Sequence, residues 1–242
     1  MARILAIDTS TAWCSVALSL GDQAPIVRHE LVSAGASQLV LPWVEDLLDE
    51  ANLKLNGLDA IAVGIGPGAF TGVRLGVAAV QGLAISCNLP VLPVASLDAI
   101  AAQFIKTEDF SRAKPAHFVI AIDARMDEIY WAKYETPIGA DQLPKRITAI
   151  HLSKPEELDL VDVDHLAGSA IKTYGDRLLT KVNVPLSSVT LDAEIHLTAL
   201  GILDCAKQNY LEGKQIDVRM LEPLYVRDKV AFTTLERQEL LK

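Results

Sequence analysis

The chain is poor in cysteine, aromatic residues and long apolar runs. Its three cysteines, spread over 242 residues, are too few and too scattered for a disulfide framework or a metal-binding knuckle. Buried thiols in a reducing compartment are the simpler interpretation. The apolar start of the chain stops at Asp8, too early for a signal peptide, and no stretch approaches the roughly 20 apolar residues of a membrane helix. We therefore expect a cytoplasmic protein without a membrane segment.

Positive charge is also scarce. Lys and Arg number 22 against 31 Asp and Glu, which gives a formal net charge of −9, and no basic run is present. A protein that binds nucleic acid on its own usually needs a basic surface, because phosphate neutralisation supplies most of the affinity. We therefore expect contact with RNA only indirectly, inside a larger complex.

The histidines form no recognisable ligand set. No two of the five are three or four positions apart, and none sits with cysteines or carboxylates in a metal-binding pattern. The sequence therefore predicts no metal site and no cofactor bound by the chain alone. We interpret each histidine as an isolated surface or structural residue: His29, His117, His151, His165 and His196.

Small and branched apolar residues are abundant, and 50% of the chain is hydrophobic. This composition favours an α/β protein with buried strands. One pattern occurs twice: an apolar strand ends in Asp, turns, and returns as a second strand. It reads LAID over residues 5–8 and IAID over residues 120–123. Such internal similarity predicts two related lobes.

The first lobe is predicted to have the order βββαβαβα. After the first hairpin we expect a strand over residues 26–31 and a helix over residues 37–52 with Ser37 as its N-cap. Pro42 is tolerated in the first turn of that helix. The later elements are strands at 60–65 and 90–94, and helices ending near 87 and spanning 96–104.

We divide the chain into an N-terminal lobe, residues 1–105, and a C-terminal lobe, residues 106–242. The stretch 139–185 is rich in Asp, Pro and Gly and predicts a less regular region. A helix follows at 196–212, and its packing on the first or the second lobe is left open. The segment after it, LEPLYVRDKVAF, is predicted to be extended.

Two turns that begin with Asp could belong to a nucleotide site or be purely structural. The turn Asp8-Thr9-Ser10 offers hydroxyls and a carboxylate but lacks a glycine at the tight position. An Asx or Ser-type turn that closes a hairpin is the favoured interpretation. Asp123 repeats Asp8 in the second hairpin, and Arg125 beside it could neutralise it.

The glycine-rich segment GPGAFTGVRLG, starting at Gly66, also has two interpretations. Glycines between a strand and a helix suggest an anion site made of backbone N–H groups. However, the segment lacks a Gly-Lys-Ser/Thr ending, and Pro67 removes a donor. The following helix is apolar almost all round, so it must be covered on more than one side. We favour a protein interface, shared with the helix at 37–52.

Together, AIDTST, GPGAFTGVRLG, QGLA, IDARMDEIYWA and PLYVRD resemble the TsaB family, also called YeaZ. Members of this family are partners of the transferase TsaD in making threonylcarbamoyladenosine on tRNAs that read ANN codons. The resemblance runs over most of the chain in the expected order. It implies an actin-like, hexokinase-like (ASKHA) fold with two ribonuclease-H-like lobes.

The resemblance also implies a subunit that performs no catalysis. TsaD carries a His-x-x-x-His metal motif whose positions fall here on Ser96 and Ile100, and neither can serve as that ligand pair. A family member resembles an inactive paralogue that pairs with TsaD, recruits the ATPase TsaE, and forms a homodimer when isolated. ATP would then be bound at the level of the complex. One departure is Ala36, where family members commonly have His.

Two sets of site residues follow from the resemblance and the motifs. The expected partner interface comprises Gln38, Leu41, Pro42, Glu45, Leu48, Phe70, Val73, Arg74, Val77, Val80 and Gln81. The remnant of a nucleotide site would comprise Asp8, Thr9, Ser10, Gly66, Gly68 and Asp123. The alternative function is a metallopeptidase or small-molecule kinase of the same fold. A chaperone-like or cell-wall-related interaction role also remains open.

Overall fold

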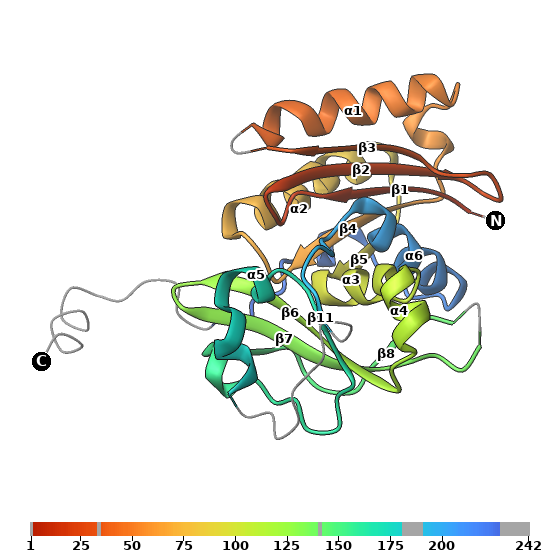
Figure 1. Cartoon of the computed structure of the whole chain (residues 1–242). Helices are drawn as coiled ribbons and strands as arrows, with labels where there is room; N and C mark the ends of the chain where they lie inside the picture. The colour runs from red at the N-terminus through yellow and green to blue at the C-terminus, as the bar shows by residue number, and fades with distance from the viewer. Residues whose placement is uncertain (1, 33–34, 140–141, 181–190, 228–242) are drawn as a thin grey trace, which may run out of the picture.

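The computed structural model describes residues 2–32, 35–139, 142–180 and 191–227, which form two β-sheets separated by helices (Figure 1). In the first sheet, β1 pairs antiparallel with β2 and parallel with β4, and the order is β3-β2-β1-β4-β5. Its strands are β1 Arg3–Asp8, β2 Trp13–Leu20, β3 Ile26–Leu31, β4 Ala60–Gly66 and β5 Val91–Ala95.

The second sheet has the order β11-β10-β6-β7-β8, with β9 also paired to β7. As in the first sheet, an antiparallel hairpin, here β6–β7, is followed by two parallel strands, β10 and β11. The α/β class predicted from the sequence is confirmed, and the structure contains two sheets. The strands are β6 His117–Arg125, β7 Glu128–Glu135, β8 Lys145–Arg146, β9 His151–Ser153, β10 His165–Ala167 and β11 Leu191–Asp192.

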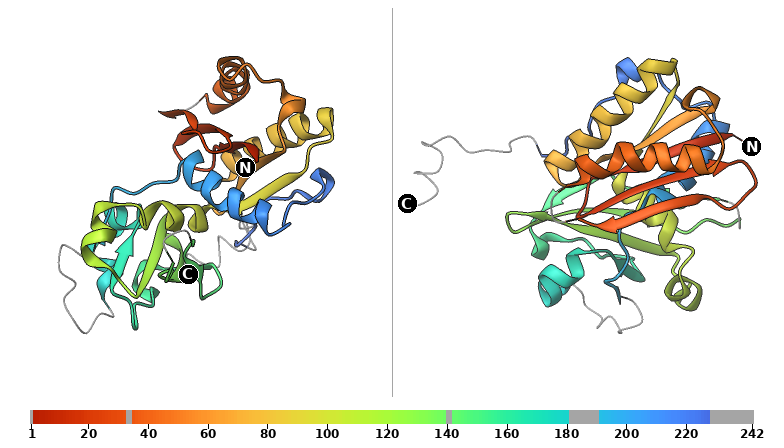
Figure 2. Two further views of the ribbon diagram at one scale, coloured as in Figure 1. Left: turned by 90° about the vertical axis from the view of Figure 1, so that its right-hand side faces the viewer. Right: turned by 90° about the horizontal axis from the view of Figure 1, so that it is seen from above.

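Helices cover both faces of the first sheet. Helices α1 and α2 lie on its outer face, whereas α3 and α6 lie between the two sheets (Figure 1 and Figure 2). The outer face of the second sheet carries α5 and short 3-10 turns. The helices are α1 Ala36–Glu50, α2 Phe70–Cys87, α3 Ser96–Phe104, α4 Glu108–Ala113, α5 Ala170–Tyr174 and α6 Ala199–Leu211; the 3-10 turns are η1 Leu55–Gly57, η2 Pro155–Glu157, η3 Gly175–Leu179 and η5 Val218–Met220.

The alternation of side chains along β1 explains these layers. Leu5 and Ile7 pack with α1 and α2, whereas Ile4 and Ala6 pack with α3, α6 and the second sheet. Successive strand residues point to opposite faces, so a strand that is apolar at every position needs cover on both sides. The first sheet is therefore the buried centre of the molecule.

The structure corrects the predicted start of α1. We expected Ser37 as the N-cap, but the helix begins at Ala36 and Gly35 occupies the capping position with φ 116° and no side-chain cap. The Gly35 carbonyl accepts a hydrogen bond from the Gln38 amide at 2.8 Å. Glycine takes this left-handed conformation without a Cβ clash, which places the cap two residues before the predicted serine.

Helix α6, whose packing the sequence left open, lies against β1 and α3. It begins at Ala199, three residues later than predicted, because Thr198 is extended and its hydroxyl caps the Leu200 amide. The chain thus returns from the second sheet to the first. Of the predicted extended segment at the C-terminal end, residues 221–227 are described without helix or strand, and residues 228–232 lie outside the described part.

Candidate functional site

The turn Asp8-Thr9-Ser10 is sealed inside the protein. Asp8 is 0% exposed, and its carboxylate accepts hydrogen bonds from the Ser10 hydroxyl at 2.8 Å and the Ser10 amide at 3.3 Å. Burial raises the pKa of Asp8 to about 6, although the two hydrogen bonds act in the opposite direction. The carboxyl is therefore enclosed and bound within its own turn.

The glycine-rich segment packs directly on this turn. The Ala69 amide at the start of α2 donates to the Ser10 carbonyl at 2.7 Å. A Cβ at Gly68 would overlap the Ser10 carbonyl oxygen, and one at Gly72 would overlap the Thr9 carbonyl oxygen. Backbone of the turn thus fills the space in which helix N–H groups would hold a phosphate. Close backbone approach accounts for these two glycines.

Gly66, the first glycine of the segment, has a backbone reason of its own. Its φ is +98°, a conformation that L side chains rarely adopt. The two positions that correspond to metal ligands in TsaD are also enclosed: Ser96 lies with its hydroxyl oxygen 3.3 Å from that of Ser10, and Ile100 is in the core. The described residues contain no group of three or more His, Cys, Asp or Glu side chains placed to hold a metal ion.

Asp123 lies two residues before the end of β6, whereas Asp8 is the last residue of β1. The Asp123 carboxylate accepts hydrogen bonds from the Arg125 amide at 2.8 Å and the Tyr174 hydroxyl at 2.9 Å. Three successive residues then take positive φ values: Arg125, Met126 and Asp127, at 60°, 56° and 62°. Left-handed conformations of residues other than glycine are strained and gather at functional sites when the surroundings hold them in place.

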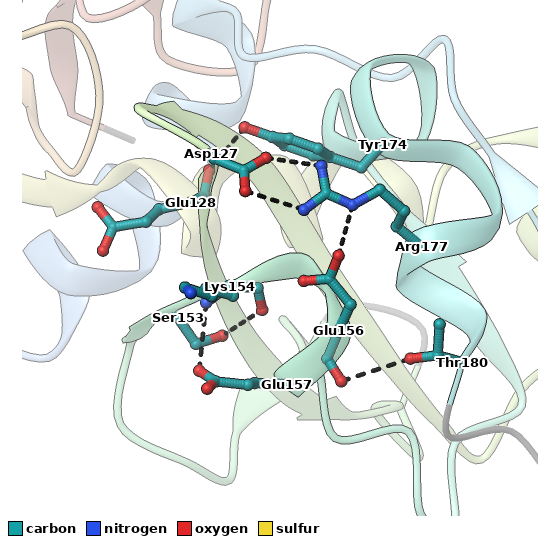
Figure 3. Close-up of polar contacts among 9 residues, drawn as sticks. All are labelled: Asp127, Glu128, Ser153, Lys154, Glu156, Glu157, Tyr174, Arg177 and Thr180. Atoms are coloured by element: carbon teal, nitrogen blue, oxygen red, sulfur yellow. Dashed lines mark hydrogen bonds and ion pairs between the residues drawn. The ribbon is translucent and has the colours of Figure 1, made fainter. Parts of the chain in front are cut away.

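Figure 3 shows how this turn is held. Arg177, from η3, donates two hydrogen bonds to the Asp127 carboxylate, at 2.6 and 2.9 Å, and one to Glu156. These bonds lower the pKa of both carboxyls. On the other side, the single proton of the Tyr174 hydroxyl is shared between Asp123 and the Glu128 carbonyl oxygen, which lies 3.1 Å away. The network leaves Arg125 and Met126 exposed at the tip of a fixed turn.

The turn forms one wall of a pocket of about 210 Å³, which we call the interlobe pocket. The start of α2 forms a second wall, and residues 223–227 form a third. Its lining is mostly apolar with three arginines at the rim: Pro67, Gly68, Ala69, Phe70, Val73, Arg74, Ala124, Arg125, Tyr130, Pro223, Leu224, Tyr225, Val226 and Arg227.

Residues 221–227 form a strap that ties the two lobes together, and the site residues chosen from the sequence did not include it. Its Leu224 amide donates to the Ile65 carbonyl of β4 at 2.8 Å. At one end Gln81 of α2 donates to the strap at the Leu221 carbonyl, 3.1 Å away. At the other end Arg227 donates to the Ala124 carbonyl and the Glu128 carboxylate. The motif PLYVRD was the sequence signal for this segment.

Seven of the eleven predicted interface residues reach the surface, and four do not. Gln38, Leu41, Pro42, Glu45, Phe70 and Arg74 are exposed, and Gln81 is half-buried. The expectation is corrected for the remaining four, because their side chains face the sheet and form the core beneath the helices: Leu48, Val73, Val77 and Val80.

The exposed side of α2 is largely apolar, although Thr71, Arg74 and Ser86 are exposed there too. Phe70 is 43% and Ile85 64% exposed, Ala78 is exposed, and a Cβ at Gly82 would meet no atom within 4 Å. By length and composition alone, α2 could cross a membrane, which corrects our expectation that no stretch is apolar enough; 28% of it is buried. One side packs on β4, and α1 and η5 also contact the helix, so a strip that includes Phe70, Ala78 and Ile85 remains exposed in the single chain.

The structure also corrects the view that all histidines are isolated. His29 of β3 and His196, just before α6, lie with their Nε2 atoms 3.1 Å apart. Trp13 stacks on both imidazoles, with ring centres at 4.5 and 4.7 Å. This cluster joins the segment before α6, which carries His196, to β2 and β3 of the first sheet.

Comparisons with known proteins agree with these features. Residues 27–142 match the family described as TsaD, tRNA N6-adenosine threonylcarbamoyltransferase. The tRNA threonylcarbamoyladenosine biosynthesis protein TsaB of Escherichia coli is 35% identical over 98% of this chain and 100% of its own length. The chain belongs to the TsaB family. TsaB of Haemophilus influenzae is 33% identical, with 98% of each protein covered, and a solved YeaZ structure from Pseudomonas aeruginosa is 36% identical with a TM-score of 0.78 over 93% of this chain and 100% of its own.

Membership of the TsaB family confirms the resemblance drawn from the sequence. Three of the segments that carried it, GPGAFTGVRLG, IDARMDEIYWA and PLYVRD, lie far apart along the chain. In the structure all three contribute to the lining of the interlobe pocket. Three of the motifs that resemble TsaB therefore converge at the junction of α2, the β6–β7 turn and the strap.

Proposed function

We propose that this chain acts in threonylcarbamoyladenosine biosynthesis as a non-catalytic subunit that pairs with a TsaD-type transferase. The observation that carries the pairing is the uncovered apolar side of α2, on which Phe70 and Ile85 are exposed. Exposed contiguous apolar surface on a folded domain marks a site of protein interaction. Membership of the TsaB family supplies the pathway.

The further details of this role also belong to the proposal. We infer that the pair recruits the TsaE ATPase and that ATP binds at the level of the complex. We also infer that tRNA is contacted only through the complex. The isolated chain would form a homodimer, and the location would be cytoplasmic. We assign the fold to the ASKHA group, with two ribonuclease-H-like lobes that arose by duplication. The shared order of strands in the two sheets supports this assignment.

The enclosed Asp8 turn supports the absence of catalysis by this chain. A catalytic carboxylate must reach its substrate within hydrogen-bonding distance, but Asp8 is 0% exposed and its Oδ1 lies against Gly64 of β4. We therefore assign the turn a structural role, which positions the N-terminal end of α2.

The experiment that tests the pairing replaces an exposed residue of α2 by a charged one. Gly76 is unsuitable, because it is buried and faces the Thr9 hydroxyl. Ile85→Glu places a charge on the apolar side without touching the core. Val161→Glu, at an exposed site in the second lobe, is the matched control, since its side chain is 68% exposed.

We expect Ile85→Glu to lose co-purification with the transferase and to keep the melting temperature of the parent chain. Val161→Glu should retain both properties. Normal assembly of the Ile85→Glu variant would refute this interface. Calorimetry of the isolated chain with Mg·ATP, and metal analysis, test the alternative of a kinase or metallopeptidase: submicromolar ATP binding or stoichiometric zinc would favour an enzyme.

A further inference from the structure

Arg74 stands in the first turns of α2 at the edge of the interlobe pocket. Its guanidinium lies over the Phe70 ring, 3.6 Å from the ring centre. Two of its nitrogens, Nε and Nη2, donate to the Tyr225 hydroxyl of the strap at 3.2 and 3.0 Å. The side chain is exposed, yet an aromatic ring and a hydroxyl hold it in one orientation.

This arginine has no carboxylate within the described part of the chain. Of the nine described arginines, seven form ion pairs, and only Arg3 and Arg74 do not. Acidic residues outnumber basic ones, 31 to 22, so an unpaired cation is not explained by a shortage of carboxylates. Arg3 instead donates to the Gly57 carbonyl at the far end of the sheet.

The position of Arg74 matters because the surface around it is apolar. If a partner covers α2, the guanidinium loses solvent and needs a counter-charge within the interface. Arginine suits this role, since its planar fork binds a carboxylate with two parallel hydrogen bonds. Orientation by Phe70 and Tyr225 reduces the entropy lost on binding.

We propose that Arg74 binds an aspartate or glutamate of the transferase subunit, and that apolar side chains beside that carboxylate pack on Phe70 and into the interlobe pocket. This inference rests on the proposed function. Tyr225 is a positioning residue, because it acts on the partner through Arg74. Nucleic acid is the less suitable occupant: phosphate contacts come in groups, and the other two arginines of the rim are already paired with Asp123 and Glu128.

The test measures the affinity of the full chain for the purified transferase in Arg74→Lys, Arg74→Gln and Arg74→Glu variants. We expect about a 10-fold loss for Lys and about a 100-fold loss for Glu, as for interface residues that dominate binding energy. The affinity of Arg74→Gln for the transferase should depend less on salt concentration than the affinity of the parent chain does. Arg112→Gln, an exposed arginine of α4 paired within its own helix, is the control and should bind normally.

The outcomes separate this inference from the proposed function. Failure of the parent chain to bind the transferase would refute the pairing itself. Normal binding by Arg74→Gln and Arg74→Glu, with the parent chain bound tightly, would refute only the role of Arg74. Loss of self-association with unchanged transferase affinity would assign the carboxylate to a second copy and overturn the proposal. Rescue of Arg74→Glu by a Lys at a transferase carboxylate would identify the partner residue.

Discussion

His29 and His196 are joined nitrogen to nitrogen, 3.1 Å apart, although 167 positions separate them in the chain. Their ring centres are 5.3 Å apart and their planes are inclined by 17°, so the imidazoles lie edge to edge. Trp13 covers both rings. The contact is therefore a single hydrogen bond in which one ring nitrogen donates and the other accepts.

The surrounding bonds assign the proton of each ring. His196 Nδ1 lies 3.0 Å from the Glu194 carbonyl oxygen, which can only accept, so this nitrogen carries a proton. Its Nε2 then accepts from His29 Nε2. The remaining nitrogen of His29, Nδ1, is buried without a partner among the described residues. Adding a proton to His29 Nδ1 would leave a buried N–H without an acceptor among the described residues.

The contribution of two buried histidines to stability should fall as the solution is acidified below neutral pH, whereas that of Asp8, whose pKa is raised, should grow over the same range. Burial lowers the pKa of His29 and of His165 from 6.5, and proximity to His196 lowers that of His29 further. On acidification the unfolded chain takes up these protons at a higher pH than the folded chain. The contribution of the two histidines to stability is therefore complete above pH 6.5 and is lost as the pH drops below it. Urea unfolding at pH 7.5 and 5.5 measures the change. His165→Leu should lose less unfolding free energy than the parent chain between these two pH values. Equal changes in the two proteins would contradict the prediction.

Asp8→Asn should stabilise the protein at pH 7.5. The folded pKa of Asp8 is raised from 3.8 to about 6, so its contribution is complete below pH 3.8 and is lost as the pH rises through 6. At neutral pH the buried Asp8 carboxylate lowers the free energy of unfolding by about 3 kcal/mol. The amide oxygen of Asn can still accept a hydrogen bond from Ser10, so Asp8→Asn should recover about 1–3 kcal/mol of this loss. Asp123→Asn is the matched control. Loss of tRNA modification in an Asp8→Asn complex that assembles normally would instead show that Asp8 takes part in chemistry.

Two glycines of α2 should respond to alanine in opposite directions. Gly72→Ala forces a Cβ into the Thr9 carbonyl oxygen, and we expect a loss of about 2–3 kcal/mol, since backbone cannot yield cheaply. At Gly82 a Cβ meets nothing within 4 Å, so Gly82→Ala should gain about 0.5–1 kcal/mol from helix propensity. Thermal unfolding of both variants tests the pair. Equal changes in the free energy of unfolding for the two variants would contradict the packing of the Asp8-Thr9-Ser10 turn against α2.

A buried hydrogen bond joins the two lobes at Tyr134 and Asp98. The Tyr134 hydroxyl donates to the Asp98 carboxylate at 2.8 Å, and Arg146 lies 3.6 Å from the same carboxylate. Tyr134→Phe removes this donor and leaves the half-buried carboxylate with the ion pair to Arg146, so we expect a loss of about 1 kcal/mol. Tyr130→Phe is the control, because no described hydrogen bond of its hydroxyl is lost. Similar unfolding free energies for the two variants would show that the bond adds no stability.

Local patterns determined much of the fold. Apolar runs that end in Asp, each followed by a returning strand, predicted β1, β2, β6 and β7. Helical spacing with its flanking turns predicted α1, α2 and α3 to within two residues at most ends. These elements bury faces whose periodicity is written in neighbouring residues. The cap at Gly35 was missed because its left-handed φ depends on how the chain enters the helix.

The site depended more on tertiary structure. The sequence by itself determined the family, the α/β class and the apolar character of α2, because each rests on residues close together in the chain or on ordered motifs. Only the tertiary structure decided that Leu48 and Val73 face inward and that Asp8 is sealed. It also joined His29 to His196 and Tyr225 to Arg74. These contacts span long stretches of chain, and no local periodicity records which distant surfaces meet.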